Sequence, residues 1–302
     1  MLRIGIDMGG SKIEAIAMDD AGHELFRKRV PTRQELGYEH IVGAIHDLYR
    51  EVADPFPDRP HTIGVCTPGS ISPRTGALRN SNTQCLNGMP VHLDLEKRFG
   101  RAVPIVNDAN CFALAEALLG AGREHHTVFG VIMGTGCGGG IVIDGRVHEG
   151  RQGIGGEWGH TVIDARGPKC YCGARGCVET FISGGGLERL WEGTHAERRS
   201  MEDIVGDFRR GQPNALAFMS AFFQQFGRAL ANLVNILDPD VIVLGGGLSN
   251  IDELYSEGVQ HVGANVFSDH FETPIVRNQL GDSSGVVGAA LAGRSREENH
   301  PV

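Results

Sequence analysis

Residues 2–12 read LRIGIDMGGSK, and residues 127–140 repeat the same design as TVFGVIMGTGCGGG. In both stretches an apolar strand ends at a glycine-rich turn, and a second apolar strand returns from it. An acidic residue close to a glycine then turns the chain into a third strand, so that residues 1–30 and 127–150 share one plan. A repeated plan of this kind indicates an internal duplication. We therefore expect two similar halves that face each other.

The first glycine turn suits a phosphate group. The bare backbone N–H groups of Gly9 and Gly10 can approach an anion closely, and Ser11 and Lys12 can donate hydrogen bonds to it. Asp7, at the end of the preceding strand, can hold Mg²⁺ through water. For either stretch taken alone, the alternative is a plain β-hairpin with a glycine turn. Two such turns in matching positions favour a polyphosphate that is gripped from both sides.

Residues 156–160 read GEWGH, and residues 170–179 read CYCGARGCVE. Three thiols and one imidazole thus lie within eighteen residues, and this Cys₃His set suits Zn²⁺ in a closed, tetrahedral structural site. The predicted ligands are His160, Cys170, Cys172 and Cys177. The alternative, three ordinary cysteines and a surface histidine, is weaker because clustering at this spacing is typical of zinc sites. Glu157 and Glu179 flank the cluster and are candidates for gripping a polar ligand.

Further polar residues lie in loops that follow apolar strands. Asn80, Asn82 and Asn87 give the loop at 70–90 amide groups that fit sugar hydroxyls, although a solvated loop is an equal alternative. Asp108 ends a strand beside the start of a helix, where catalytic carboxylates are commonly found. A lone aspartate at such a place can also simply cap the helix.

Glycines also follow the apolar strand at 241–244, since residues 245–247 are all glycine. Such a turn after a parallel strand makes a nucleotide crevice, and a simple strand-to-helix turn is the alternative. Apolar residues at helical spacing predict most of the helices of the chain. Helices are expected over residues 34–53, 91–99, 109–121, 215–237 and 284–294.

Composition argues against several classes of protein. The chain has 302 residues, enough for about two domains. A net charge of −9 argues against nucleic acid or an anionic membrane surface as a partner, because both need a basic face. No apolar run reaches about 18 residues, so no transmembrane helix is expected. Seven cysteines and a start without an apolar leader favour the cytoplasm, where thiols stay reduced.

The chain resembles the ROK family of sugar kinases. The likeness covers nearly the whole chain and rests on six motifs that occur in the family's order. These are D-x-G-G-S-K at 7–12, N-D-A-N at 107–110, G-T-G-x-G-G-G at 134–140, E-W-G-H at 157–160, C-x-C-G-x-x-G-C-x-E at 170–179 and the triple glycine at 245–247. Within the family, the stretches at 70–76, 81–83 and 86–88 are most similar to bacterial fructokinases of the mannose- or fructose-phosphorylating type.

The resemblance implies an α/β, actin-like fold of two ribonuclease-H-like domains with a cleft between them. It implies a smaller domain over residues 1–117, onto which helix 284–294 packs back, and a larger domain over 118–302 with the zinc segment at 156–179. ATP, bound with Mg²⁺, would lie between the two glycine hairpins, with its adenosine near residues 245–248. The implied ATP-binding residues are Asp7, Gly9, Gly10, Ser11, Lys12, Gly134, Thr135, Gly136, Gly138, Gly246, Gly247 and Leu248.

The implied reaction transfers a phosphoryl group from ATP to the 6-hydroxyl of a hexose, with Asp108 as catalytic base. Fructose is the expected hexose, and glucose, mannose and N-acetylglucosamine are alternatives. The implied sugar-binding residues are Gly69, Asn82, Asn107, Asp108, Glu157, His160 and Glu179. His160 would then use one ring nitrogen for zinc and the other for the sugar.

A sugar-responsive repressor is the non-enzymatic alternative, because such proteins share this body within the family. Asp7 stands so near the start of the chain that no DNA-binding helix-turn-helix is expected before it. A non-catalytic sugar sensor is disfavoured because Asp7, Asp108 and both glycine hairpins are present. A homodimer is expected from the family alone.

Overall fold

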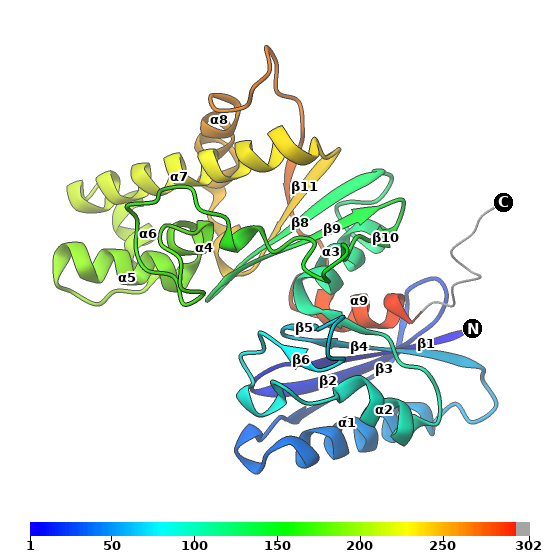
Figure 1. Cartoon of the computed structure of the whole chain (residues 1–302). Coiled ribbons are helices and arrows are strands. Elements are labelled where there is room, and N and C mark those ends of the chain that lie inside the picture. Colours follow the sequence, from blue (N-terminus) through cyan, green and yellow to red (C-terminus); the bar gives the residue numbers. More distant parts are fainter. Residues whose placement is uncertain (294–302) are drawn as a thin grey trace.

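The computed structural model describes residues 1–293 and contains two five-stranded sheets (Figure 1). In the first sheet the strands follow the order β3-β2-β1-β4-β7. The pairs β1–β2 and β2–β3 are antiparallel, whereas β1–β4 and β4–β7 are parallel. The strands are β1 (Leu2–Met8), β2 (Lys12–Met18), β3 (Glu24–Pro31), β4 (His61–Thr67) and β7 (Ile105–Asn107).

The second sheet repeats this plan, with the strand order β10-β9-β8-β11-β12. Its antiparallel pairs β8–β9 and β9–β10 and its parallel pairs β8–β11 and β11–β12 occupy the corresponding places. The strands are β8 (Thr127–Met133), β9 (Cys137–Ile143), β10 (Arg146–Val147), β11 (Val241–Gly245) and β12 (Ile275–Arg277). The turn from β1 to β2 is therefore equivalent to the turn from β8 to β9, and the predicted internal duplication is confirmed.

Two helices cover the outer face of the first sheet, at the bottom of Figure 1. These are α1 (Tyr38–Ala53) and α2 (Val91–Phe99). Successive side chains of a strand point to opposite faces, and the even-numbered residues of β1 share one apolar core with the buried residues of α1 and α2. The odd-numbered residues of β1, which include Asp7, point toward the centre of the molecule.

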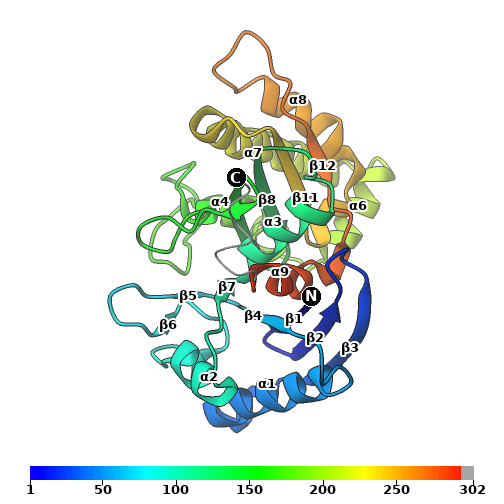
Figure 2. The same ribbon diagram turned by 90° about the vertical axis from the view of Figure 1, so that its right-hand side faces the viewer.

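Two further helices lie between the sheets and join the halves (Figure 2). The helix α9 (Ser284–Ala292) packs on β1 and β4. A Cβ atom at Gly5 or Gly64 would lie 2.1 Å from a backbone oxygen of α9, so glycine at both positions allows this close approach. The helix α3 (Asp108–Leu119) packs against α9 on one side and against β8 and β9 on the other.

The outer face of the second sheet is covered by a group of helices that includes the long α7 (Pro213–Leu237). Phe222, Phe223 and Phe226 of α7 are almost fully buried and share an apolar core with Phe129 of β8. The other helices of this group are α4 (Val178–Ile182), α5 (Gly184–His195), α6 (Met201–Arg209) and α8 (Glu257–Gly263). The predicted apolar stripe over 215–237 is thus part of the core.

Element ends differ from the sequence predictions by a few residues. The helix predicted over 34–53 begins at Tyr38, because Gly37 has a φ of +84° and separates α1 from a short 3₁₀ turn. The helix predicted over 284–294 ends at Ala292, and residue 294 lies outside the described residues. The loop at 70–90 contains a two-stranded ribbon of β5 (Ser70–Ile71) and β6 (Leu78–Arg79).

The two-domain, actin-like α/β fold agrees with the expectation. The division into residues 1–117 and 118–302 falls within α3 and stays a prediction. Among residues 1–293, no helix combines the length and the apolarity that a membrane span requires.

Candidate functional site

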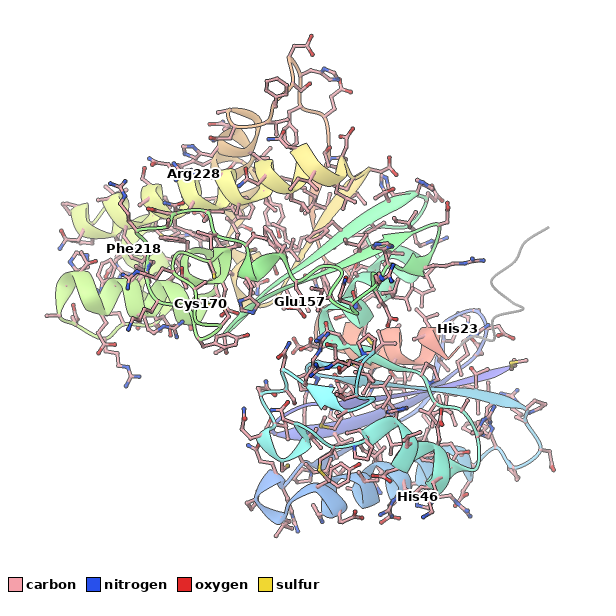
Figure 3. The ribbon with its side chains drawn as sticks, viewed as in Figure 1. His23, His46, Glu157, Cys170, Phe218 and Arg228 are labelled. Carbon is pink, nitrogen blue, oxygen red and sulfur yellow. The ribbon has the colours of Figure 1, made fainter. Side chains whose placement is uncertain are left out.

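A cavity of about 620 Å³ lies between the two halves, beside the N-terminus of α3. Its walls come from the loop after β4, from the start of α3, from the turn between β8 and β9 and from the cysteine-rich segment. Figure 3 shows Glu157 and Cys170 on the side of the upper half that faces the first sheet. The cavity is lined by Gly69, Asn82, Asn107, Asp108, Glu157, His160 and Glu179, together with Gly134, Thr135, Gly136 and Gly138. All seven residues predicted for the sugar therefore meet in one place.

Asp108 stands at the end of β7, where the chain enters α3. The side chain of Asn107 takes the N-cap role, since its Oδ1 accepts a hydrogen bond from Ala109 N at 2.9 Å. Asp108 Oδ1 accepts from the same amide at 2.8 Å, and solvent reaches the carboxylate through the cavity. Its position deep between the two halves, together with the negative charges of Asp7 and Glu157, raises the pKa of Asp108 to about 6. Such a carboxylate is mostly ionised at neutral pH, and its pKa lies close enough to that pH for it to accept a proton.

A second cavity, of about 950 Å³, opens on the other side of the turn between β8 and β9. Gly134 and Thr135 line both cavities, so the turn separates them. Gly247 and Leu248, which follow β11, line the second cavity, whereas Gly246 packs beneath it, where a Cβ atom would lie 2.5 Å from Met133 O. The far wall is formed by Gly184, Gly185, Glu188, Met201, Glu202, Val205, Gly206 and Arg209 of α5 and α6. The sequence carries no motif that would have identified this wall.

The first glycine turn borders the site without lining either cavity. Gly10 approaches the first cavity, since a Cβ atom there would lie 3.9 Å from Oδ1 of Asn82, which lines that cavity. Ser11 and Lys12 are exposed, and Lys12 Nζ lies 3.7 Å from Glu14 Oε2. Burial is the main cause that raises the pKa of Asp7, and the charge of Glu14 adds to it. The Asp7 carboxylate in turn raises the pKa of Asp108, so these two carboxylates of the first half are coupled electrostatically.

The cysteine-rich segment brings four donor atoms together. One atom from each of His160, Cys170, Cys172 and Cys177 lies within 4.8 Å of all the others. Cys170 Sγ is 3.6 Å from His160 Nδ1, and the Sγ atoms of Cys172 and Cys177 are also 3.6 Å apart. Four thiolate or imidazole ligands around a tetrahedral zinc ion would be separated by about 3.5–3.8 Å, from metal–ligand distances of about 2.0–2.3 Å. The donor set and its spacing are compatible with Zn²⁺.

Glu179 connects this segment to the turn between β8 and β9. It is 8% exposed, and its Oε2 accepts a hydrogen bond from Cys137 N at 3.0 Å. Gly184, just after α4, donates its N–H to Gly134 O at 2.8 Å. The segment that carries the cysteines therefore also holds the glycine turn in place.

Tyr171 was not predicted as a site residue, yet it lines the cavity. It stands between Cys170 and Cys172, and its hydroxyl lies 3.0 Å from His160 Nε2. Its neighbours in the sequence are metal-ligand candidates, and this is the one signal that could have singled it out.

Comparison with known proteins places these features in a family. A model of the ROK family matches residues 3–295. The N-acetyl-D-glucosamine kinase of Pasteurella multocida is 37% identical over 300 residues, which are 96% of this chain and 98% of that protein. The crystal structure of the ROK hexokinase from Thermus thermophilus has a TM-score of 0.87, at 35% identity and 97% coverage of both chains. A ROK family glucokinase from Streptomyces griseus, crystallised with glucose and AMPPNP, has a TM-score of 0.76 at 29% identity and covers 96% of this chain and 98% of its own. The chain therefore belongs to the ROK family of sugar kinases.

Proposed function

We propose that this protein transfers the γ-phosphoryl group of ATP to the 6-hydroxyl of a hexose. The observation that carries the proposal is the position of the Asp108 carboxylate. It faces a polar cavity between the two halves, and one wall of that cavity is the glycine turn that also lines the second cavity. A hexose in the first cavity and ATP in the second would meet at Gly134 and Thr135.

Asp108 would act as the general base. It would accept the proton of the 6-hydroxyl as that oxygen attacks the γ-phosphorus and ADP leaves, so that hexose 6-phosphate forms and one proton is released. A sugar hydroxyl is a poor nucleophile at neutral pH, and a positioned base contributes about 10²–10⁴-fold to the rate. Mg²⁺ bound with ATP would neutralise charge on the phosphates, with Asp7 holding it through water. The backbone N–H groups of both glycine turns would assist.

The sugar-binding role falls to Asn82, Asn107, Glu157, His160 and Glu179, and Gly69 also lines the cavity. Amide and carboxylate groups in this density suit a ligand with many hydroxyls. We propose Zn²⁺ as the ion of the four-donor site, where it would fix the segment that carries His160 and Glu179. Its role would be structural, because four protein ligands leave no open position.

Fructose is the hexose that we propose, on the basis of the loop at 70–88 and its likeness to bacterial fructokinases. N-acetylglucosamine is the second candidate, because the Pasteurella multocida relative acts on it by name. The loop reaches the sugar cavity through Asn80 and Asn82, which makes it a reasonable source of selectivity.

A coupled assay of ADP release would test both the proposed reaction and the proposed hexose. Fructose, mannose, glucose and N-acetylglucosamine would be compared at equal ATP and Mg²⁺, with and without a zinc chelator, and NMR would locate the phosphate on the product. We expect the highest kcat/KM with fructose and a 6-phosphate product. A preference for N-acetylglucosamine would make it the substrate in place of fructose. If none of the four hexoses raises ADP release above the rate without sugar, the proposed function is refuted.

A further inference from the structure

His160 is held at both of its ring nitrogens. Its Nδ1 faces Cys170 Sγ at 3.6 Å, on the side of the four-donor site. Its Nε2 faces the Tyr171 hydroxyl at 3.0 Å, and the two rings meet edge to face at 90° with their centroids 5.1 Å apart. One nitrogen thus serves the metal site, and the other is paired with a tyrosine that lines the sugar cavity.

The direction of the second hydrogen bond follows from the first contact. A metal ion binds the lone pair of an imidazole nitrogen, so an ion on Nδ1 leaves the proton on Nε2. His160 Nε2–H is then the donor, and the Tyr171 hydroxyl oxygen is the acceptor. A sugar hydroxyl that approached His160 from the cavity would need this same donor.

The Tyr171 side chain is free to move away from His160. Its side chain is 80% exposed, so little packing holds the ring in place. It also lines a wider cavity of about 1100 Å³, whose other residues come mainly from the loop at 70–88. The ring can therefore swing toward this open space without disturbing the core.

We infer that the Tyr171 hydroxyl occupies the place of a sugar hydroxyl on His160, so that a hexose must displace it in order to bind. This inference rests on the proposed function. Tyr171 therefore helps to set the affinity for sugar. The apparent affinity is lowered in proportion to the fraction of molecules in which Tyr171 occupies His160, because only the other molecules can bind sugar there. The effect applies only to sugars that use His160, so Tyr171 also reports which hexoses do so.

Removal of the hydroxyl alone is the direct test. In Tyr171→Phe the ring stays and the competitor is lost, so the Kd of the hexose that wild type phosphorylates should fall about two- to fivefold, because a single exposed hydrogen bond is weak. Titration calorimetry without ATP would measure the Kd, and zinc content should equal that of wild type. An unchanged or higher Kd in Tyr171→Phe overturns the inference.

A spectroscopic readout separates displacement from a general change in the segment. The ¹⁵N shift of His160 Nε2 should differ between wild type and Tyr171→Phe without sugar, and the two proteins should give the same shift with sugar bound. A difference that persists with saturating sugar contradicts displacement.

Tyr49→Phe is a matched control from the other half of the molecule. The Tyr49 hydroxyl lies 2.8 Å from His61 Nε2, so this variant also loses a tyrosine–histidine pair, but far from the cavity. Its hexose Kd should equal that of wild type, and an equal gain in both variants would refute a local effect at Tyr171. If wild type binds no hexose, the proposed function fails; if it binds one with the same Kd as Tyr171→Phe, only this inference fails.

Discussion

The two glycine turns have the same backbone plan but different supports. The turn between β1 and β2 is held by Thr32, which immediately follows β3. Thr32 Oγ1 donates to Gly9 O at 2.6 Å, and Thr32 N donates to Ser11 O at 3.0 Å. The turn between β8 and β9 is held instead by Glu179 and Gly184, from the segment that follows the metal-site cysteines.

This difference shows how the duplication was adapted. Each half offers a glycine turn, but only the second turn is bonded to the segment that also shapes the sugar cavity. The support of the first turn at Thr32 can therefore be altered without changing the cysteine-rich side of the sugar cavity. A change in the cysteine-rich segment should instead affect both the sugar cavity and the second turn. Substitutions in either half test this asymmetry, and the carboxylate that faces the second turn should show the largest effect.

Asp108→Asn should have the largest effect, a loss of about 10²–10⁴-fold in kcat, because the amide has the same shape but cannot accept the proton. The folded protein raises the pKa of Asp108 above its ordinary value, so ionisation costs stability as pH rises through about 6. The Tm of the variant at pH 7.5 should thus equal or exceed that of wild type. Steady-state kinetics and calorimetry would measure both, and near-normal kcat would remove Asp108 from the mechanism.

Loss of the metal site should have the second-largest effect. In Cys172→Ala, zinc content should fall and the KM for hexose should rise about tenfold or more, because Glu179 and His160 lose their anchor. The KM for ATP should change less, since the first turn is held by Thr32. Cys85→Ala is the matched control for zinc content, which should equal that of wild type, because Cys85 lies outside the four-donor cluster. Full hexose affinity in a zinc-free protein would show that the metal is not needed to position the residues that bind the sugar.

Acid should affect the reaction through Asp108. Because the base must be ionised, kcat/KM should fall about tenfold for each pH unit below about 6. The charge of Asp7 helps to raise this pKa, so Asp7→Asn should move the acid limb of the profile to lower pH. A pH–rate profile of both proteins would show this shift, and coincident acid limbs would exclude electrostatic coupling between these two carboxylates.

The duplicated plan was predictable because it rests on local patterns. Apolar strands and glycine turns at 2–12 and 127–140 are visible in the sequence, and both appear as hairpins at equivalent places. Apolar spacing also located α7 and α2 closely. The start of α1 was missed because a single residue, Gly37 with its positive φ, decides it.

The parts of the fold and of the site that could not be predicted depend on contacts between distant segments. Gln279 and Leu280 illustrate this, since their N–H groups bond to the fully buried carboxylate of Glu116 on α3 and so fix the approach to α9. The wall that α5 and α6 give the second cavity has no motif of its own. Tyr171 has a sequence context but no pattern that indicates where its hydroxyl points.

The smallest expected effects come from a direct comparison of the two supports. Thr32→Val removes the hydroxyl that holds Gly9 but keeps the shape of a fully buried side chain, so the KM for ATP should rise about threefold through one lost hydrogen bond. The KM for hexose should stay unchanged. Glu179→Gln keeps an oxygen for Cys137 N but loses the charge, so both KM values should rise, that for hexose by about tenfold and that for ATP by about twofold.

Steady-state kinetics with each substrate varied in turn would distinguish the two variants. A rise in the KM for hexose in Thr32→Val would mean that the first turn also supports the residues of the sugar cavity. A change confined to ATP in Glu179→Gln would mean that Glu179 supports the second turn alone. Either result would replace the asymmetry by two equivalent turns, because the different supports of Gly9 and Cys137 would then have no different consequence.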